Sequence, residues 1–221
     1  MGRKKRRGRS SYVVTRTSKK NVPGSGTPKH RFAQHLERDG QKQQLSGNLR
    51  ECAIPSGVPA THTSYRGGCN YKLIRAYEVS DPRGYGLSGG GNIKQRLYHG
   101  TRETSAAHIM LQSFKLPAHG GMFGKAIYLT PNIGKAFGFT DSKNPIILVC
   151  DANLGRVRTF NESDRGLDLF SANNAGFDTA FGERGVTASW GGSLTFSEYA
   201  VYDPNRIRIR YLLEYKAANQ K

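Results

Sequence analysis

The sequence lacks any long apolar segment. No run of 18 apolar residues occurs, so no helix is expected to span a bilayer. No apolar segment of the kind found in a signal peptide follows the N-terminal charges either, which argues against secretion. We therefore expect a soluble intracellular protein.

Cysteine is scarce. Cys52, Cys69 and Cys150 are odd in number and show no C-x-x-C spacing, so we expect neither a disulfide framework nor a cysteine zinc site. A reducing compartment fits this pattern. The histidines have no metal-ligand spacing, and we expect His62, His108 and His119 to have no special role. No metal site is predicted.

Acidic residues are few, with 16 Asp and Glu against 34 Lys and Arg and a net charge of +18. Residues 1–50 carry fourteen Lys and Arg against two acids, or +12, which leaves +6 for residues 51–221. We expect residues 1–50 to be a basic leader, disordered alone, and residues 51–70 to be a linker. The run from Lys4 to Arg7 could be a nuclear address, a phosphate-binding arm or a solubilising tail.

The rest reads as one domain, residues 71–217, that begins with a strand over 71–79. A short strand, "QRLYHG", ends at Gly100, and "TRETSAAHIMLQSF" has the apolar spacing of a helix, with Thr101 or Thr104 as its N-cap. His99 would therefore lie at a strand-to-helix junction. Further on, "AIYLT" predicts a strand and "IGKAFGF" a short helix.

The second half of this domain is predicted to be mostly strand and loop. "PIILVCDANLG" is an apolar β-branched run typical of a central strand buried on both faces, and residues 156–192 are expected to form long loops. Two strands, "EYAVYD" and "RIRYLLEYK", follow. The alternating arginines Arg206, Arg208 and Arg210 favour a solvated edge strand over a surface for an acidic partner. The fold class is α+β on a mostly antiparallel sheet.

Three segments, "LYHGTR" (97–102), "GMFGKAIYLT" (121–130) and "SEYAVYDPNRIRIRYLLEY" (197–215), carry a resemblance. In order and spacing they resemble the catalytic domain of the poly(ADP-ribose) polymerase family, the diphtheria-toxin-like ADP-ribosyltransferases. The resemblance implies an NAD cleft in which the family's His-Tyr-Glu signature falls on His99, Tyr128 and Glu198.

The resemblance also implies a role for each of these residues. His99 would bind the adenosine ribose, the Gly100 backbone would bond the nicotinamide carboxamide, and Tyr128 would stack on the nicotinamide. Glu198 would hold the nicotinamide-ribose 2′-hydroxyl and orient the acceptor. Three further positions complete the NAD-binding set, namely Thr101, Phe139 and Lys125, the last toward the acceptor side.

The residue chemistry suits these roles. Loss of nicotinamide leaves an oxocarbenium-like ribose, and a carboxylate such as Glu198 stabilises that positive charge. An aromatic face suits a ring that is cationic in NAD. Two positions depart from the family pattern: Phe139 stands where a tyrosine is usual, and Ala136 stands where a serine bonds the carboxamide, a loss of about 1 kcal/mol.

Two functions remain open from the sequence. The first is transfer of ADP-ribose from NAD to a protein acceptor, which could be the chain itself, or to nucleic acid, as single units or as a polymer. The second is a nucleic-acid-binding protein that works through its basic leader and has weak or no catalysis. An RNA 2′-phosphotransferase is disfavoured because its basic residues are not found.

Overall fold

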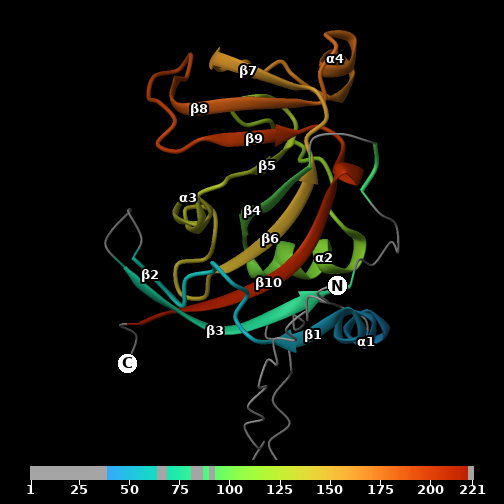
Figure 1. The fold of residues 1–221 in the computed structure, drawn as a ribbon, viewed down its shortest axis with the longest axis vertical. Coiled ribbons are helices and arrows are strands. Elements are labelled where there is room, and N and C mark those ends of the chain that lie inside the picture. The colour runs from blue at the N-terminus through green and yellow to red at the C-terminus, as the bar shows by residue number, and fades with distance from the viewer. Residues whose placement is uncertain (1–38, 64–68, 81–86, 90–92, 219–221) are drawn as a thin grey trace, which may run out of the picture.

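The computed structural model describes residues 39–63, 69–80, 87–89 and 93–218, so most of the basic leader, with Lys4 to Arg7, lies outside the described residues. The described chain forms two β-sheets with short helices around them (Figure 1). In chain order the elements are α1 (Asp39–Asn48), β1 (Leu49–Cys52), β2 (Thr61–Thr63), β3 (Asn70–Val79), β4 (Ile93–Thr101), α2 (Glu103–Gln112), β5 (Ile127–Leu129), α3 (Ile133–Phe137), β6 (Ile146–Asn153), β7 (Val157–Glu162), α4 (Leu169–Asn174), β8 (Thr179–Thr187), β9 (Glu198–Val201), the one-turn 3-10 helix η2 (Pro204–Arg206) and β10 (Ile207–Ala217).

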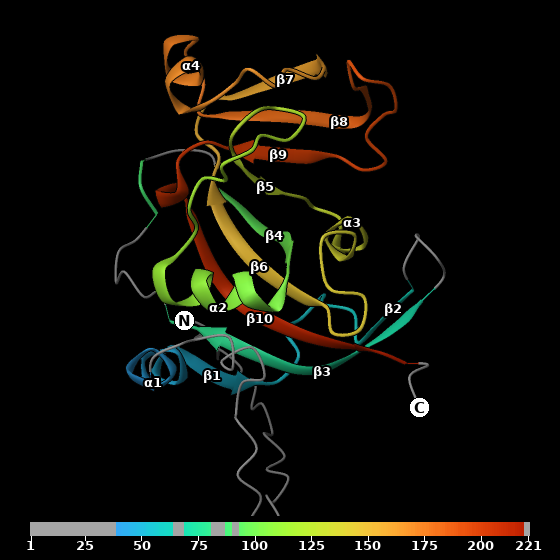
Figure 2. The same ribbon diagram turned by 180° about the vertical axis from the view of Figure 1, so that it is seen from behind.

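The first sheet has the strand order β1-β3-β10-β6-β4, with β2 also paired to β3, and all its pairs are antiparallel. The second sheet has the order β5-β9-β8-β7, in which only β7 and β8 run parallel. Figure 2 shows this smaller sheet set beyond one end of the first. The predicted α+β class with mostly antiparallel sheets is confirmed.

Strand β6 is buried along its whole length, as its apolar run predicted. Leu148 on one face packs in a core with Met110 of α2. Ile147 on the other face packs in a second core with Phe137 of α3. The two helices therefore cover opposite faces of the first sheet (Figure 1), and the core on the α2 side also includes Val201 of β9 in the second sheet.

A backbone bridge joins the two sheets. The amide of Tyr98 in β4 donates to the carbonyl of Thr130, at 2.8 Å, and the amide of Thr130 donates back at 3.0 Å. Since Tyr98 precedes His99 and Thr130 follows Tyr128 by two residues, this bridge brings two parts of the predicted signature together.

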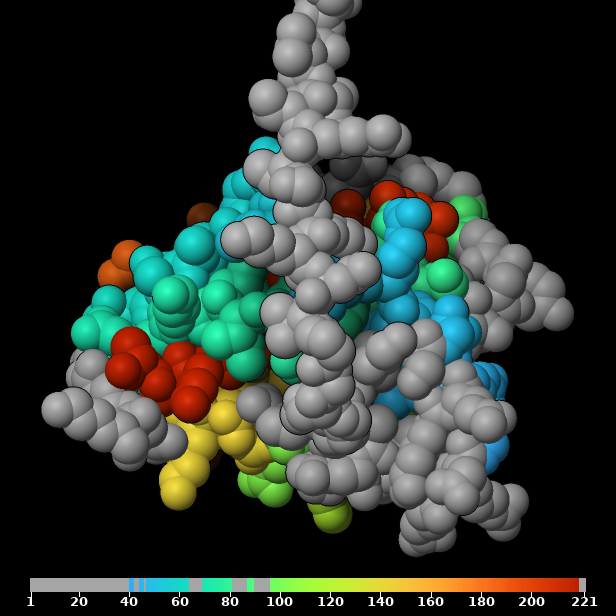
Figure 3. Space-filling view, turned by 90° about the horizontal axis from the view of Figure 1, so that it is seen from below, coloured from blue at the N-terminus to red at the C-terminus, as the bar shows by residue number. Residues whose placement is uncertain are grey.

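The predicted linker is wrong in part. Strand β1, which crosses the boundary between the predicted leader and the predicted linker, and strand β2, inside residues 51–70, both pair with β3. Seen from the end opposite the second sheet, β2 and β3 form the surface beside the end of β10 (Figure 3). These short polar strands have little apolar patterning, because each contributes only an edge to the sheet.

The predicted long loops over 156–192 are also wrong, since β7, α4 and β8 lie there. Strand β7 is exposed along most of its length and so lacks an alternating pattern. The N-cap of α2 is Arg102, without a side-chain hydrogen bond, rather than Thr101 or Thr104. Thr101 is instead the last residue of β4.

Strand β10 is not an edge strand but lies between β3 and β6. Its arginines Arg208 and Arg210 are paired with Asp151, at 3.3 and 3.6 Å, and Arg206, which precedes β10 in η2, is paired with Asp178 at 3.0 Å. The alternation that suggested a solvated edge reflects charge pairing on a central strand.

Candidate active site

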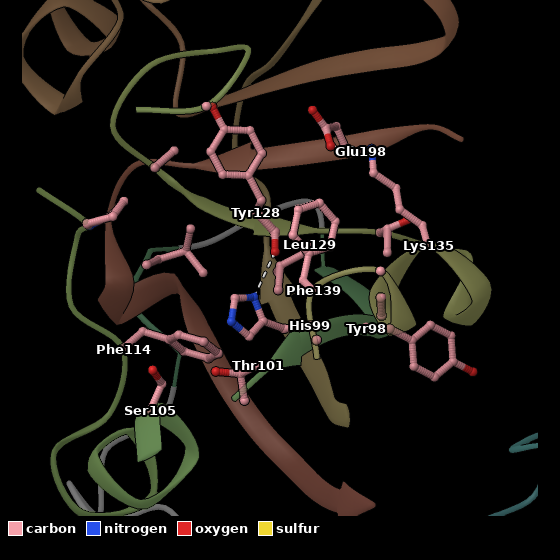
Figure 4. Close-up of a pocket in the computed structure, with 18 of the residues that line it drawn as sticks. Tyr98, His99, Thr101, Ser105, Phe114, Tyr128, Leu129, Lys135, Phe139 and Glu198 are labelled. Carbon is pink, nitrogen blue, oxygen red and sulfur yellow. Dashed lines mark hydrogen bonds and ion pairs between the residues drawn. The ribbon is translucent and has the colours of Figure 1, made fainter. Parts of the chain in front are cut away.

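A cavity of about 710 Å³ is lined by residues from both sheets and from α2 and α3 (Figure 4). This volume lies within the usual range for small-molecule sites. The predicted residues on its wall are Tyr128, Glu198, His99, Gly100, Thr101 and Phe139. Residues from positions 99 to 198 of the sequence thus face one space.

His99 is held at the back of this cavity by two contacts. Its Nδ1 lies 3.0 Å from the carbonyl oxygen of Tyr128, and its ring meets that of Phe114 edge-on at 5.0 Å. Because a carbonyl can only accept, Nδ1 carries the proton and Nε2 is left to accept a hydrogen bond. Burial lowers the pKa of His99, against a smaller upward effect of the Tyr128 carbonyl, so the neutral imidazole is favoured.

Gly100 has a packing requirement that the sequence does not reveal. A Cβ at this position would overlap the carbonyl oxygen of Ala136 in α3. Glycine therefore lets α3 approach β4 closely, and it leaves the backbone of residue 100 on the cavity wall. Ala136 lines the same wall, at the position where the resemblance predicted a missing hydroxyl.

The ring of Tyr128 is fixed by its hydroxyl group. The hydroxyl accepts from the amide of Phe123 and donates to the carbonyl of Gly124, both at 2.8 Å. Burial raises the pKa of Tyr128 well above its usual range, so the phenol stays protonated. The residue can therefore offer a rigid aromatic face rather than a proton.

Glu198 is the first residue of β9 and is almost fully buried. The ammonium group of Lys135, in α3, donates a hydrogen bond to its carboxylate and a second one, at 3.1 Å, to the carbonyl of Phe196. Burial lowers the pKa of Lys135, while Glu198 acts in the opposite direction. The ion pair fixes the orientation of the carboxylate at the cavity wall (Figure 4).

The remaining predicted residues differ in position. Thr101 and Phe139 line the cavity, Thr101 buried and Phe139 63% exposed. Lys125 is exposed and is not among the lining residues, although its charge acts on Asp168 nearby. Its placement leaves it outside the cavity and on the surface beside it.

Lys135 and His108 also line the cavity, and neither was predicted as a site residue from the sequence. Lys135 was not singled out, and only its position seven residues after Tyr128, on one face of a short helix, could have pointed to it. His108, which was expected to have no special role, lines the cavity from α2. Its spacing of nine residues from His99 gives no recognisable motif.

Two mostly antiparallel sheets with a cavity that contains a histidine, a tyrosine and a glutamate define the ADP-ribosyltransferase fold class. Residues 53–217 match the family model described as "Poly(ADP-ribose) polymerase catalytic domain", and the chain belongs to this family. Enzymes of the family use NAD as the substrate for ADP-ribosyl transfer.

Several curated proteins are similar to this chain. Poly [ADP-ribose] polymerase 2-B of Oryza sativa subsp. japonica is 25% identical over 193 residues, which cover 72% of this chain and 32% of that protein. Poly [ADP-ribose] polymerase 2 of Homo sapiens is 28% identical over 193 residues, 73% and 33% of the two chains. The chain thus spans about a third of the length of these relatives.

None of the helices among the described residues combines the length and the apolar composition needed to cross a bilayer.

Proposed function

We propose that this domain transfers ADP-ribose from NAD to an acceptor and releases nicotinamide. The observation that carries the proposal is the single cavity on whose wall His99, Gly100, Tyr128 and Glu198 lie. Family membership supports the same activity.

The geometry supports a definite orientation of NAD. Nε2 of the neutral His99 would accept a hydrogen bond from a hydroxyl of the adenosine ribose. The backbone of Gly100, on the cavity wall, would bond the carboxamide, and the fixed ring of Tyr128 would stack on the cationic nicotinamide. Phe139 offers a second aromatic face, and Thr101 lines the wall next to Gly100.

Glu198 would act on the nicotinamide ribose. An acceptor oxygen or nitrogen forms a bond to C1′ while the bond from C1′ to the nicotinamide nitrogen breaks, and nicotinamide leaves neutral with the bonding pair. The acceptor loses its proton to Glu198 or to water. The carboxylate stabilises the positive charge on the ribose in the transition state, and Lys135 holds it in orientation.

The acceptor is proposed to be a macromolecule. A protein, including this chain itself, would serve as acceptor, and the presence of Glu198 is compatible with both single units and polymer formation. Lys125, on the surface beside the cavity, is proposed to contact the acceptor. Residues 1–50, with a net charge of +12, are proposed to attract nucleic acid, and Lys4 to Arg7 to direct the chain to the nucleus.

The experiment is incubation of the full chain with NAD labelled on the adenylate. Wild-type protein should release nicotinamide and label itself or added histones. Glu198→Gln should lower nicotinamide release by about a hundredfold or more, the scale seen when one transition-state contact is lost. The alternative, a nucleic-acid-binding protein without catalysis, predicts no nicotinamide release from the wild type.

Deletion of residues 1–38 separates the two candidates further. It should leave NAD turnover in place under the proposed function. Under the alternative, the main consequence would be loss of salt-sensitive nucleic-acid binding. A chain that binds nucleic acid but consumes no NAD would refute the proposal.

A further inference from the structure

Trp190 is an unusual surface residue beside the cavity. It lies on the turn between β8 and β9 and is 55% exposed. The guanidinium carbon of Arg165 stands 4.9 Å from the centroid of its ring, in cation–π contact. One indole face is thus covered by a cation, and much of the side chain stays open to solvent.

This pair is attached to the cavity wall from both sides. The turn that carries Trp190 is closed by a bridge between Thr187 and Ser193, and Ser193 lines the cavity with Leu194 and Thr195. The segment that carries Arg165 is bonded to the same turn, because Ser163 donates its amide to Thr187 and accepts from the amide of Ser189.

A second bond ties the Arg165 segment to the wall at Met122. The amide of Asp164 donates to the carbonyl of Met122, a lining residue, at 2.9 Å. Arg165 is also close enough to Tyr128 for its charge to act on the phenol. The pair therefore lies near the cavity that contains Glu198, where an acceptor would approach.

The chemistry of the pair fits a nucleotide. An indole face accepts a planar base by stacking, and a guanidinium offers paired donors to a phosphate. The acid that precedes Arg165 in the chain, Asp164, accepts a hydrogen bond from the amide of Gly166 at 3.0 Å through its carboxylate. An acidic peptide would satisfy Arg165 but would leave Trp190 without a ring to stack on.

We infer that Arg165 and Trp190 form a platform for an acceptor nucleotide of single-stranded nucleic acid. A single strand is required because the base faces of a duplex are already stacked on one another. The net charge of +18, most of it in residues 1–50, would attract a polyanion to the domain. This inference rests on the proposed function, since the platform would serve the same transfer reaction.

The test uses a property of the sequence: Trp190 is the only tryptophan in the chain. A short single-stranded oligonucleotide with a terminal phosphate is titrated into the full-length protein, and the tryptophan emission is followed. Saturable quenching is expected. Arg165→Ala should weaken the binding that quenches by about tenfold, the scale of one lost charge-assisted hydrogen bond.

Arg158→Ala is the matched control. Arg158 is also exposed and also lies over an aromatic ring, 5.2 Å from the Phe160 centroid, but its partner ring is the half-buried Phe160 and not the exposed Trp190. The control removes the same charge from the same domain and should leave the quenching curve within about twofold of wild type. If both variants weakened oligonucleotide binding equally, net charge alone would explain the loss and the inference would be overturned.

Transfer to nucleic acid is then measured as the amount of labelled oligonucleotide divided by the amount of nicotinamide released. In Trp190→Ala the amount of labelled oligonucleotide per nicotinamide released should fall about tenfold, and Trp190→Phe should recover part of the loss. Oligonucleotide binding without quenching, or equal quenching by an acidic peptide or by free ADP-ribose, would overturn the inference.

The two proposals fail separately. Quenching that depends on Arg165 in a protein that releases no nicotinamide would refute the proposed function and leave Arg165 and Trp190 as a nucleotide-binding site without transfer. Nicotinamide release without quenching or oligonucleotide labelling would refute the platform alone.

Discussion

The ammonium group of Lys135 and the carboxylate of Glu198 form an ion pair in the cavity wall, although 63 residues separate them in the chain. Both side chains are about nine-tenths buried. A carboxylate in such surroundings would be costly without a partner, and the lysine supplies one while leaving it beside the cavity.

Removal of the lysine should therefore affect both folding and catalysis. Lys135→Met leaves Glu198 buried and unpaired, and we expect a loss of about 3 kcal/mol in the free energy of unfolding. Nicotinamide release should also fall by tenfold or more. Denaturant unfolding and an NAD-turnover assay measure the two effects.

The double variant Lys135→Met/Glu198→Gln supplies the control. Since it removes both charges, it should recover at least 1 kcal/mol of the stability lost in Lys135→Met, while its activity stays low. Strictly additive losses in the two single variants would show that the pair is not coupled.

The same pair predicts an alkaline limit to activity. Burial lowers the pKa of Lys135, so its ammonium group should lose its proton below pH 10.5, the usual value for lysine. Above that folded pKa the ion pair with Glu198 is lost and kcat should decline. Lys135→Arg keeps its charge at every such pH, so any activity it retains should show no decline of this kind.

The burial of His99 predicts that the stability of the fold depends on pH in the acidic range. The folded protein binds a proton at His99 more weakly than the unfolded chain does, because burial lowers its pKa below 6.5. Its contribution to stability is thus complete above pH 6.5 and is lost as the pH falls through the folded pKa. The urea midpoint of wild type should drop more steeply from pH 7.5 to pH 5 than that of His99→Gln, and parallel curves would contradict this.

Gly100 predicts a steric effect. Gly100→Ala should destabilise the fold by about 1–3 kcal/mol, because the new methyl group meets the carbonyl of Ala136 and forces α3 away from β4. Gly166→Ala is a suitable control, since a Cβ there makes only an ordinary contact with Asp164. Thermal unfolding of both variants tests the prediction, and equal melting temperatures would disprove it.

Ala136 allows a gain of function. Ala136→Ser would place a hydroxyl on the cavity wall beside Gly100, and one added hydrogen bond of about 1 kcal/mol should tighten NAD binding about fivefold. Isothermal titration with NAD measures the change. Ala136→Gly, which adds no donor, should not tighten binding.

Local patterns in the sequence determined the central buried strand and the family to which the chain belongs. The apolar run of β6 specified a strand buried on both faces, because its successive side chains from Ile146 to Cys150 are all apolar. The motifs around His99, Tyr128 and Glu198 indicated the family, and all three line one cavity. Strands with polar or charged faces, such as β1, β7 and β10, were misread because their burial depends on neighbours far along the chain.

Only the tertiary structure decided how the site is held. That Gly100 must lack a side chain follows from the approach of α3 to β4, which no local spacing encodes. The partner of Glu198 is a lysine on a different element, and the platform of Arg165 and Trp190 depends on a turn folded against a distant loop. Side-chain types are fixed by the sequence, but desolvation and partners arise when separate segments pack together, and these set the charge and orientation of each group.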